Sequence, residues 1–127
     1  TQVVLPRLKT DLVEIMEAVV DEKLADLPIE WADNAAVCVV MASGGYPMSY
    51  EKGHVISGID KAEEMEDVTV FHAGTKLTPE GFTNNGGRVL GVTAMDDNLD
   101  KAIKKAYEAV SKISWKDEFH RNDIGVK

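Results

Sequence analysis

Apolar residues recur at spacings of three and four in two stretches of the chain, which is the spacing of one face of a helix. The first stretch covers residues 6–22, where Pro6 suits the first helical position. The second covers residues 98–113, and Asp97 is its expected N-cap. The apolar stripes consist of Leu8, Leu12, Ile15, Met16 and Val19 in the first helix, and of Leu99, Ala102, Ile103, Ala106, Val110 and Ile113 in the second.

Between these helices the pattern predicts strands. Residues 35–42 form a nearly continuous apolar run, which is typical of a strand buried on both faces. Alternation or β-branched content predicts further strands over residues 54–59, 68–74 and 88–94. Turns rich in Gly, Pro and Asn separate them, at residues 43–47, 78–81 and 84–87. Turn-linked strands with a late helix predict an antiparallel α+β domain.

Composition narrows the class of protein. A length of 127 residues favours one domain. The net charge of −8 argues against a nucleic-acid partner, because phosphate backbones require a basic surface. The single cysteine, Cys38, lies in an apolar run, so we expect a small buried side chain and a reducing cytoplasm. The longest apolar stretch, residues 35–42, is too short to span a membrane, and no signal peptide is visible.

Arg88 lies between a glycine turn and an apolar strand that is expected to be part of the core. A charged residue at that position either faces water at a strand edge or binds an anion. Gly86 and Gly87 favour the second interpretation, because their backbone can approach a ligand closely. Lys76 precedes the neighbouring turn, and a hairpin would bring it beside Arg88. Two cations with glycine amides would hold a phosphate group.

The other candidates have weaker patterns. The segment Ser43–Pro47 is either a turn or a glycine loop whose amides face a ligand. His54, His72 and His120 show no metal-binding spacing, so structural roles are favoured. The acidic cluster of Glu63, Glu64, Glu66 and Asp67 either binds a cation or faces solvent, and such runs are typical of a solvated surface. Arg121 and Asp123 are expected to form a local ion pair or to anchor the last strand.

Seven segments, in this order, resemble the carboxy-terminal end of the glycinamide ribonucleotide synthetases, also called phosphoribosylamine–glycine ligases. The resemblance covers essentially the whole chain, and seven segments in register make it specific. They read TQVVLPRLKTDLVEI, SGGYP, KGHVISGID, VFHAGTK, NNGGRVLGVTA, AIKKAYEAV and RNDIG.

The resemblance implies an ATP-grasp enzyme that joins glycine to 5-phosphoribosylamine through a glycyl phosphate, in purine synthesis. Residues 1–22 would be the last helix of the ATP-grasp region. Residues 23–127 would be the C-terminal domain, a small β-barrel-like or sandwich-like unit with flanking helices that is called a rudimentary hybrid motif. The cofactors would be ATP and magnesium, or manganese in its place. The metal ligands and the ATP-binding lysine of the family lie upstream of Thr1, so we expect this chain to be one part of the enzyme and inactive alone.

The resemblance also implies roles for individual residues. Lys76 and Arg88 match positions at which related enzymes hold the 5′-phosphate of a ribonucleotide, and the rest of the same cleft would be formed by Gly44, Gly45, Tyr46, His72, Thr75, Gly86 and Gly87. The implied partners are glycine, 5-phosphoribosylamine and the rest of the enzyme, without nucleic acid or membrane. Two alternatives remain open: another ATP-grasp ribonucleotide ligase or carboxylase, and a non-catalytic binding module.

Overall fold

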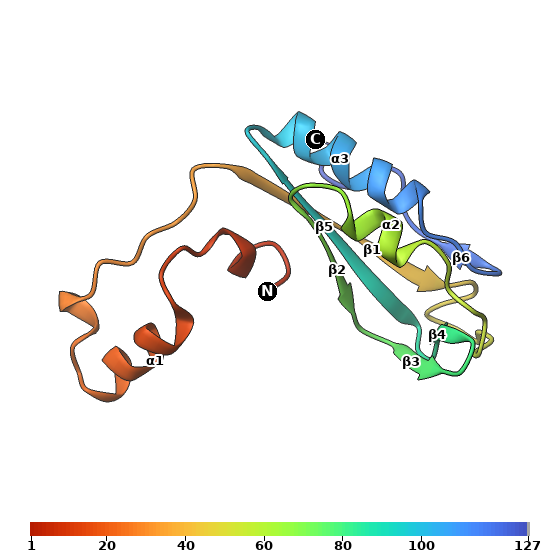
Figure 1. Ribbon diagram of the computed structural model, residues 1–127, viewed down its shortest axis with the longest axis horizontal. Coiled ribbons are helices and arrows are strands. Elements are labelled where there is room, and N and C mark those ends of the chain that lie inside the picture. The colour runs from red at the N-terminus through yellow and green to blue at the C-terminus, as the bar shows by residue number, and fades with distance from the viewer. Residues whose placement is uncertain (127) are drawn as a thin grey trace.

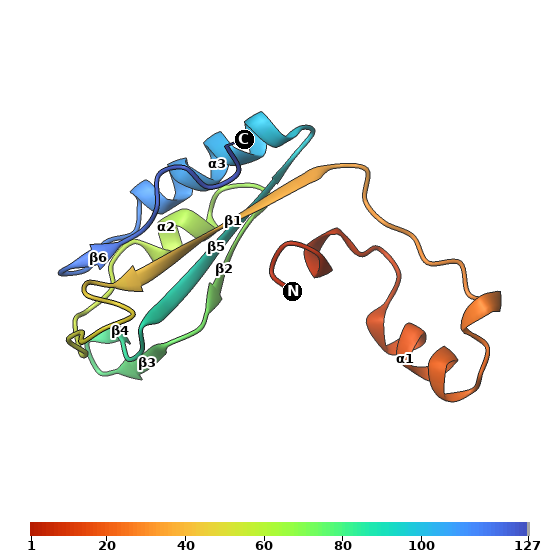
Figure 2. The ribbon, with the colours of Figure 1, turned by 180° about the vertical axis from the view of Figure 1, so that it is seen from behind.

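An N-terminal arm of residues 1–34 leads into a sheet with two helices packed on one of its faces, in a computed structural model that describes residues 1–126 (Figures 1 and 2). In both views the helical part of the arm lies apart from the sheet, whereas its first residues lie near strands β2 and β5. The arm contains the 3-10 helix η1 (Leu5–Arg7), the helix α1 (Leu12–Val20) and the 3-10 helix η2 (Leu24–Asp26).

The prediction of one continuous helix over residues 6–22 is wrong. Leu8 pairs with Trp31 in an isolated β-bridge, which interrupts the helix after η1. Asp11 then caps α1, because its side chain accepts a hydrogen bond from the Val13 amide at 2.7 Å. None of the residues of α1 is buried, although its apolar stripe has the predicted spacing.

The α+β class is confirmed. All strand pairings are antiparallel, and the strands form an open four-stranded sheet in the order β2-β5-β1-β6 together with a separate hairpin, β3-β4. The predicted barrel is not formed by residues 1–126, because β2 and β6 remain unpaired edges of an open sheet. The strands are β1 (Ala35–Ser43), β2 (Val68–His72), β3 (Thr75–Thr78), β4 (Gly81–Asn84), β5 (Arg88–Asp96) and β6 (Glu118–Phe119).

Helices α2 (Ile59–Glu63) and α3 (Leu99–Ser111) cover one face of the sheet. The N-cap of α3 is Asn98, whose side chain accepts from the Lys101 amide at 3.0 Å, so the expected cap at Asp97 is wrong by one residue. The predicted buried face is confirmed for Ala102, Ala106, Val110 and Ile113, whereas Ile103 is half-buried and Leu99 is exposed.

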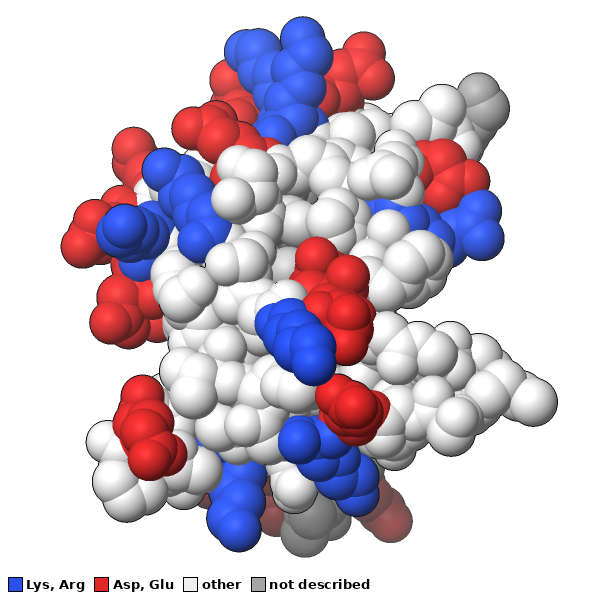
Figure 3. Space-filling model, turned by 90° about the vertical axis from the view of Figure 1, so that its right-hand side faces the viewer, with Lys and Arg blue, Asp and Glu red and all other residues white. Residues whose placement is uncertain are grey.

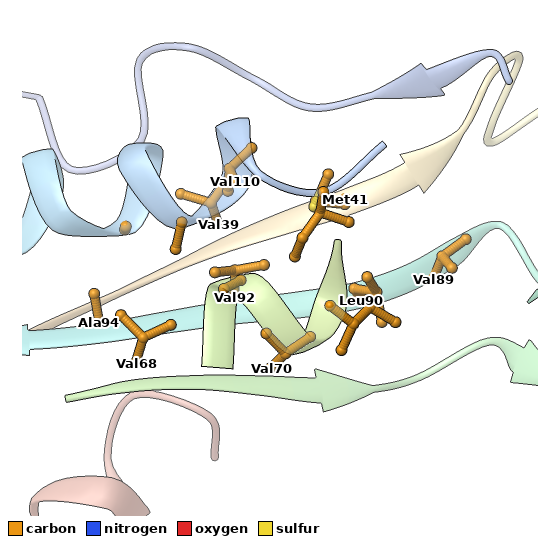
Figure 4. Packing of buried hydrophobic residues seen from close by; sticks show 14 of the residues in the cluster. Val39, Met41, Val68, Val70, Val89, Leu90, Val92, Ala94 and Val110 are labelled. Atoms are coloured by element: carbon orange, nitrogen blue, oxygen red, sulfur yellow. The ribbon is translucent and has the colours of Figure 1, made fainter. Parts of the chain in front are cut away.

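The core lies between the sheet and these two helices (Figure 4). Val39 and Met41 of β1 meet Val92 of β5 and Val110 of α3 there. The other face of β1 is only partly covered, and Val40 is 41% exposed. The prediction that this strand is buried on both faces is therefore wrong, because the two helices pack on the same face.

The segment of residues 54–59 was expected to be a strand, and this expectation is wrong. Val55 and Ser57 form only isolated bridges, to Thr83 and to Ser114. Gly53 and Gly58 adopt φ values of 87°, which turn the chain at both ends of the segment. No helix within residues 1–126 has the length and apolar character needed to cross a membrane.

Candidate functional site

Arg88 begins β5, directly after the turn that joins the β3-β4 hairpin to the sheet. It lies opposite Ala42 of β1, at a register shift between Met41 and Ala42. Such irregularities bend a strand and redirect its side chains. The Arg88 side chain is exposed, whereas the next residue, Val89, is fully buried. The sheet therefore places a guanidinium group at its end without burying the charge.

Two glycine-containing loops meet beside Arg88. The Asn85 amide donates to the Gly74 carbonyl at 2.7 Å. A Cβ atom on Gly74 would lie 2.6 Å from the Arg88 carbonyl oxygen and 2.9 Å from the Gly86 Cα. This close approach leaves no room for a side chain at residue 74. The two loops can pack backbone against backbone because residues 74 and 86 are both glycine.

A cleft of about 740 Å³ lies along this junction. The Tyr46 ring packs directly on Gly87, where a Cβ atom would lie only 2.1 Å from a ring carbon. Gly87 is buried as a result, and yet it borders the cleft. The cleft is lined by Thr1, Gln2, Val40, Tyr46, Ala73, Gly74, Gly87, Arg88, Leu90 and Gly91.

Two amides of the turn have no hydrogen-bond acceptor within the described chain. Among the contacts of residues 1–126, neither the Gly86 nor the Gly87 amide donates a hydrogen bond. Buried amides in folded proteins are nearly always paired, so an unpaired amide at the buried Gly87 is unusual. An anion beside Arg88 would satisfy these donors as well as the guanidinium group.

The loop after β1 separates this cleft from a second one of about 840 Å³. Gly44, Gly45 and Tyr46 line the second cleft, so Tyr46 borders both. Gly45 has a φ of 92°, and the Tyr46–Pro47 peptide is cis. Three acidic residues, Glu51, Asp117 and Glu118, also line it. The second cleft is therefore a poor site for a phosphate group.

His72 and Thr75 contact each other outside the Arg88 cleft. The His72 Nδ1 lies 2.9 Å from the Thr75 hydroxyl, and the His72 ring packs against Phe82 with centroids 4.5 Å apart. His72 lines a third cleft, whose walls include Thr1 and Gln2. Because Thr1 and Gln2 also line the Arg88 cleft, the two clefts are neighbours.

Lys76 lies on β3 opposite Thr83, and its side chain is exposed. It is not among the residues that line the Arg88 cleft. The sequence-predicted residues therefore divide into three sets. Tyr46, Gly87 and Arg88 share one cleft, and Gly86 adjoins it. Gly44 and Gly45 line the second cleft, whereas Lys76, His72 and Thr75 lie on the neighbouring strands β2 and β3.

Comparison with protein-family models matches residues 36–127 to "Phosphoribosylglycinamide synthetase, C domain". The chain belongs to this family. It is 55% identical to a phosphoribosylamine–glycine ligase of Rhodopirellula baltica, over 99% of this chain and 29% of that protein. It is 49% identical to the trifunctional purine biosynthetic protein adenosine-3 of Gallus gallus, over 99% of this chain and 13% of that protein.

A solved structure of a phosphoribosylamine–glycine ligase from Thermotoga maritima is similar to this chain, with a TM-score of 0.67 and 31% identity. The match covers 87% of this chain and 27% of the Thermotoga chain. This chain thus spans less than a third of the length of these relatives. The family's C domain begins at residue 36, beside the start of β1 at Ala35.

Sequence reasoning missed one cluster of metal-ligating side chains. Glu51, His54 and Asp117 each offer a ligand atom, and these atoms lie within 4.8 Å of one another. His54 Nε2 lies 2.8 Å from Glu51, and Lys116 Nζ lies 3.8 Å from the same carboxylate oxygen. These contacts pair Glu51 with His54 and with Lys116, and Asp117 adds a second carboxylate beside them. Only Glu51 and His54 are close in sequence, so no spacing signal could reveal Asp117.

Charge and thiol chemistry elsewhere are ordinary. On the face in Figure 3, basic and acidic side chains lie side by side, and this face carries no extended basic patch. Cys38 is half-buried and lies 3.5 Å from the Gln2 side-chain oxygen. Burial raises the pKa of the Cys38 thiol, with Thr93 opposing the shift, so the nucleophilic thiolate is disfavoured. The local ion pair expected between Arg121 and Asp123 is confirmed.

Proposed function

We propose that this chain is the C-terminal part of a phosphoribosylamine–glycine ligase, and that Arg88 binds the 5-phosphate of 5-phosphoribosylamine. Family membership supports the first part of the proposal. The observation that carries the second is the unpaired amide of the buried Gly87 next to the exposed Arg88 guanidinium, at the wall of a cleft. A guanidinium fork and backbone amides together match the oxygens of a phosphate group.

In this proposal the contribution of the domain to catalysis is positioning. Arg88 and the turn amides hold the phosphate, which fixes the distance and direction of the ribosyl amine at the other end of the substrate. Tyr46 forms a wall of the cleft, and Gly74 and Gly86 keep the two loops in contact. Lys76 would add a second cation from the neighbouring hairpin, and His72 with Thr75 would border the same region.

ATP, glycine and magnesium would be held by the parts of the enzyme outside this chain. When bound, ATP supplies the energy for forming the carbon–nitrogen bond. The Glu51–His54–Asp117 cluster does not fit the divalent ion, because the Lys116 ammonium lies beside Glu51. Because ATP, glycine and magnesium would be bound elsewhere, we propose that the 127-residue chain is inactive alone. We also propose that the complete enzyme acts in the cytoplasm. The exposed apolar residues of α1 would then pack against the ATP-grasp region.

The proposal is tested with Arg88→Ala in the complete enzyme. Loss of a charge-assisted phosphate contact costs about 1.5–3 kcal/mol, so the KM for phosphoribosylamine should rise by about 10- to 150-fold. The KM values for ATP and glycine should stay close to those of the wild type. Arg121→Ala is the matched control, because Arg121 is an exposed arginine whose side chain is paired with Asp123. Wild-type values of both kcat and the phosphoribosylamine KM in Arg88→Ala would overturn the proposal.

A further inference from the structure

Two buried polar residues, Asn84 and Ser43, connect the interior of the domain to the turn that precedes Arg88. Their exposed fractions are 1% and 2%, respectively. Polar side chains are rarely so deeply buried unless a specific hydrogen-bond network requires them. Neither residue lines the Arg88 cleft.

The Asn84 side chain uses both its donor and its acceptor group in hydrogen bonds. Its Nδ2 donates to the Ser43 hydroxyl at 2.8 Å and to the Glu51 carbonyl at 2.7 Å. Its Oδ1 accepts from the His54 amide at 2.8 Å. Both hydrogens of the amide group are therefore used, one by the Glu51 carbonyl and one by the Ser43 hydroxyl, whose oxygen must act as the acceptor.

Ser43 connects Asn84 to the glycine turn through a further hydrogen bond. Because its oxygen accepts from Asn84, its single hydrogen is free to donate, and it bonds to the Gly86 carbonyl at 2.7 Å. The Ser43 backbone amide also donates to the Gly87 carbonyl, at 2.8 Å. Ser43 thus holds two consecutive carbonyl groups of the turn toward the interior.

Because the peptide between Gly86 and Gly87 is planar, the position of the Gly86 carbonyl fixes the direction of the Gly87 N–H. In a trans peptide the C=O and N–H groups point to opposite sides. Because the Gly86 carbonyl points at Ser43, the Gly87 N–H of the same peptide points away from Ser43. This N–H is the donor that has no acceptor within residues 1–126.

We propose that Asn84 and Ser43 are positioning residues, which orient the Gly86–Gly87 peptide so that its amide is presented to the phosphate group. The inference rests on the proposed function of Arg88. It assigns a role to two residues that touch neither the substrate nor the guanidinium group. The effect on the substrate is indirect and passes through the orientation of one peptide.

The first test is Ser43→Ala in the complete enzyme. The substitution removes one hydroxyl group and with it the bond to the Gly86 carbonyl. We expect the KM for phosphoribosylamine to rise by about five- to tenfold, which corresponds to one neutral hydrogen bond, with unchanged KM values for ATP and glycine. A purely structural role would lower the melting temperature or the active fraction without changing the KM of one substrate. Ser57→Ala is the matched control, because it also removes a hydroxyl-to-carbonyl bond, between Ser57 and Ser114, outside the Arg88 cleft.

Asn84→Ala is the second variant, and it decides the question if Ser43→Ala does not fold. It leaves the Ser43 hydroxyl without its orienting donor, so the same selective rise in KM is expected. Hydrogen exchange of the Gly86 and Gly87 amides in the complete enzyme provides a readout that is independent of catalysis. Added inorganic phosphate should slow this exchange in the wild type and to a smaller extent in either variant.

The outcomes separate the two proposals. An unchanged KM in Arg88→Ala would remove the proposed function, and the exchange experiment would then decide the inference alone. A raised KM in Arg88→Ala with wild-type KM values in a folded Ser43→Ala or Asn84→Ala variant would overturn the inference. Equal protection of the two amides by phosphate in wild type and variants would also overturn it.

Discussion

The arm and the sheet domain contain helices of similar pattern with opposite burial. In α3, Ala106 and Val110 are fully or almost fully buried, whereas in α1 Met16 is 57% exposed and no residue is buried. Both helices have apolar residues at spacings of three and four, and both begin with a side-chain cap. An amphipathic pattern therefore predicts a helix and an apolar face, but does not identify the surface that covers this face.

The contacts that hold the arm are polar. The Arg7 guanidinium donates to the Asn34 side-chain oxygen at 3.2 Å and to the Ala32 carbonyl at 3.0 Å. The Thr10 hydroxyl accepts from the Glu30 amide at 2.7 Å. These bonds connect the two strands of chain on either side of α1 and require little apolar burial. The domain, in contrast, is held by a continuous core.

The largest expected effect distinguishes two methionines. Met41 is fully buried, so Met41→Ala in the 127-residue chain should lower the free energy of unfolding by about 2–5 kcal/mol. Met16→Ala should change it by about 0.5 kcal/mol or less, because Met16 lies on the exposed arm. Urea unfolding followed by fluorescence measures both values. Similar losses for the two variants would contradict the distinction between the regions.

A smaller effect tests how closely the domain is packed. Gly53 and Gly58 have the same φ of 87°, but only at Gly58 would a Cβ atom collide, 1.7 Å from the Lys112 carbonyl oxygen. Nothing lies within 4 Å of the corresponding position at Gly53. In both variants the free energy of unfolding should fall by about 1–2 kcal/mol, because alanine is less stable than glycine in a left-handed conformation. Gly58→Ala should lose about 1–3 kcal/mol more, since α2 must move away from the end of α3.

Chemical unfolding of Gly53→Ala and Gly58→Ala, side by side, provides the measurement. Because the backbone conformation is shared, the difference between the two reports the contact alone. Equal stabilities would mean that the junction between α2 and α3 yields without cost, and the close packing inferred for the domain would then be wrong.

Much of the domain was predictable because its signals are local. The apolar run at residues 35–42, the β-branched segments near Val70 and Val92 and the helix before Ile113 all correspond to observed elements. A hairpin near Lys76 was expected, but its strands β3 and β4 were not predicted, since each is only four residues long and lies beside a turn whose residues dominate the pattern. The break in the first helix depends on the pairing of Leu8 with Trp31, which no local spacing reveals.

The candidate site was predictable only in part. Glycines next to Arg88 indicated a close backbone approach, and the contact between Gly74 and Gly86 is of that kind. The network of Asn84 and Ser43 was not foreseen, because it joins residues 41 positions apart in the chain. The residue type of Asn84 predicts a turn, whereas Asn84 is fully buried at the end of β4.

The central claim is that Arg88 recognises a phosphate group, and a comparison of two ligands tests it most directly. The affinities of ribose 5-phosphate and of ribose are measured by calorimetry for the complete enzyme and for Arg88→Ala, which isolates the coupling between the phosphate group and the arginine. If Arg88 binds the phosphate group, the preference for ribose 5-phosphate over ribose should fall by about 10- to 150-fold in Arg88→Ala. An undiminished preference in the variant would contradict the account.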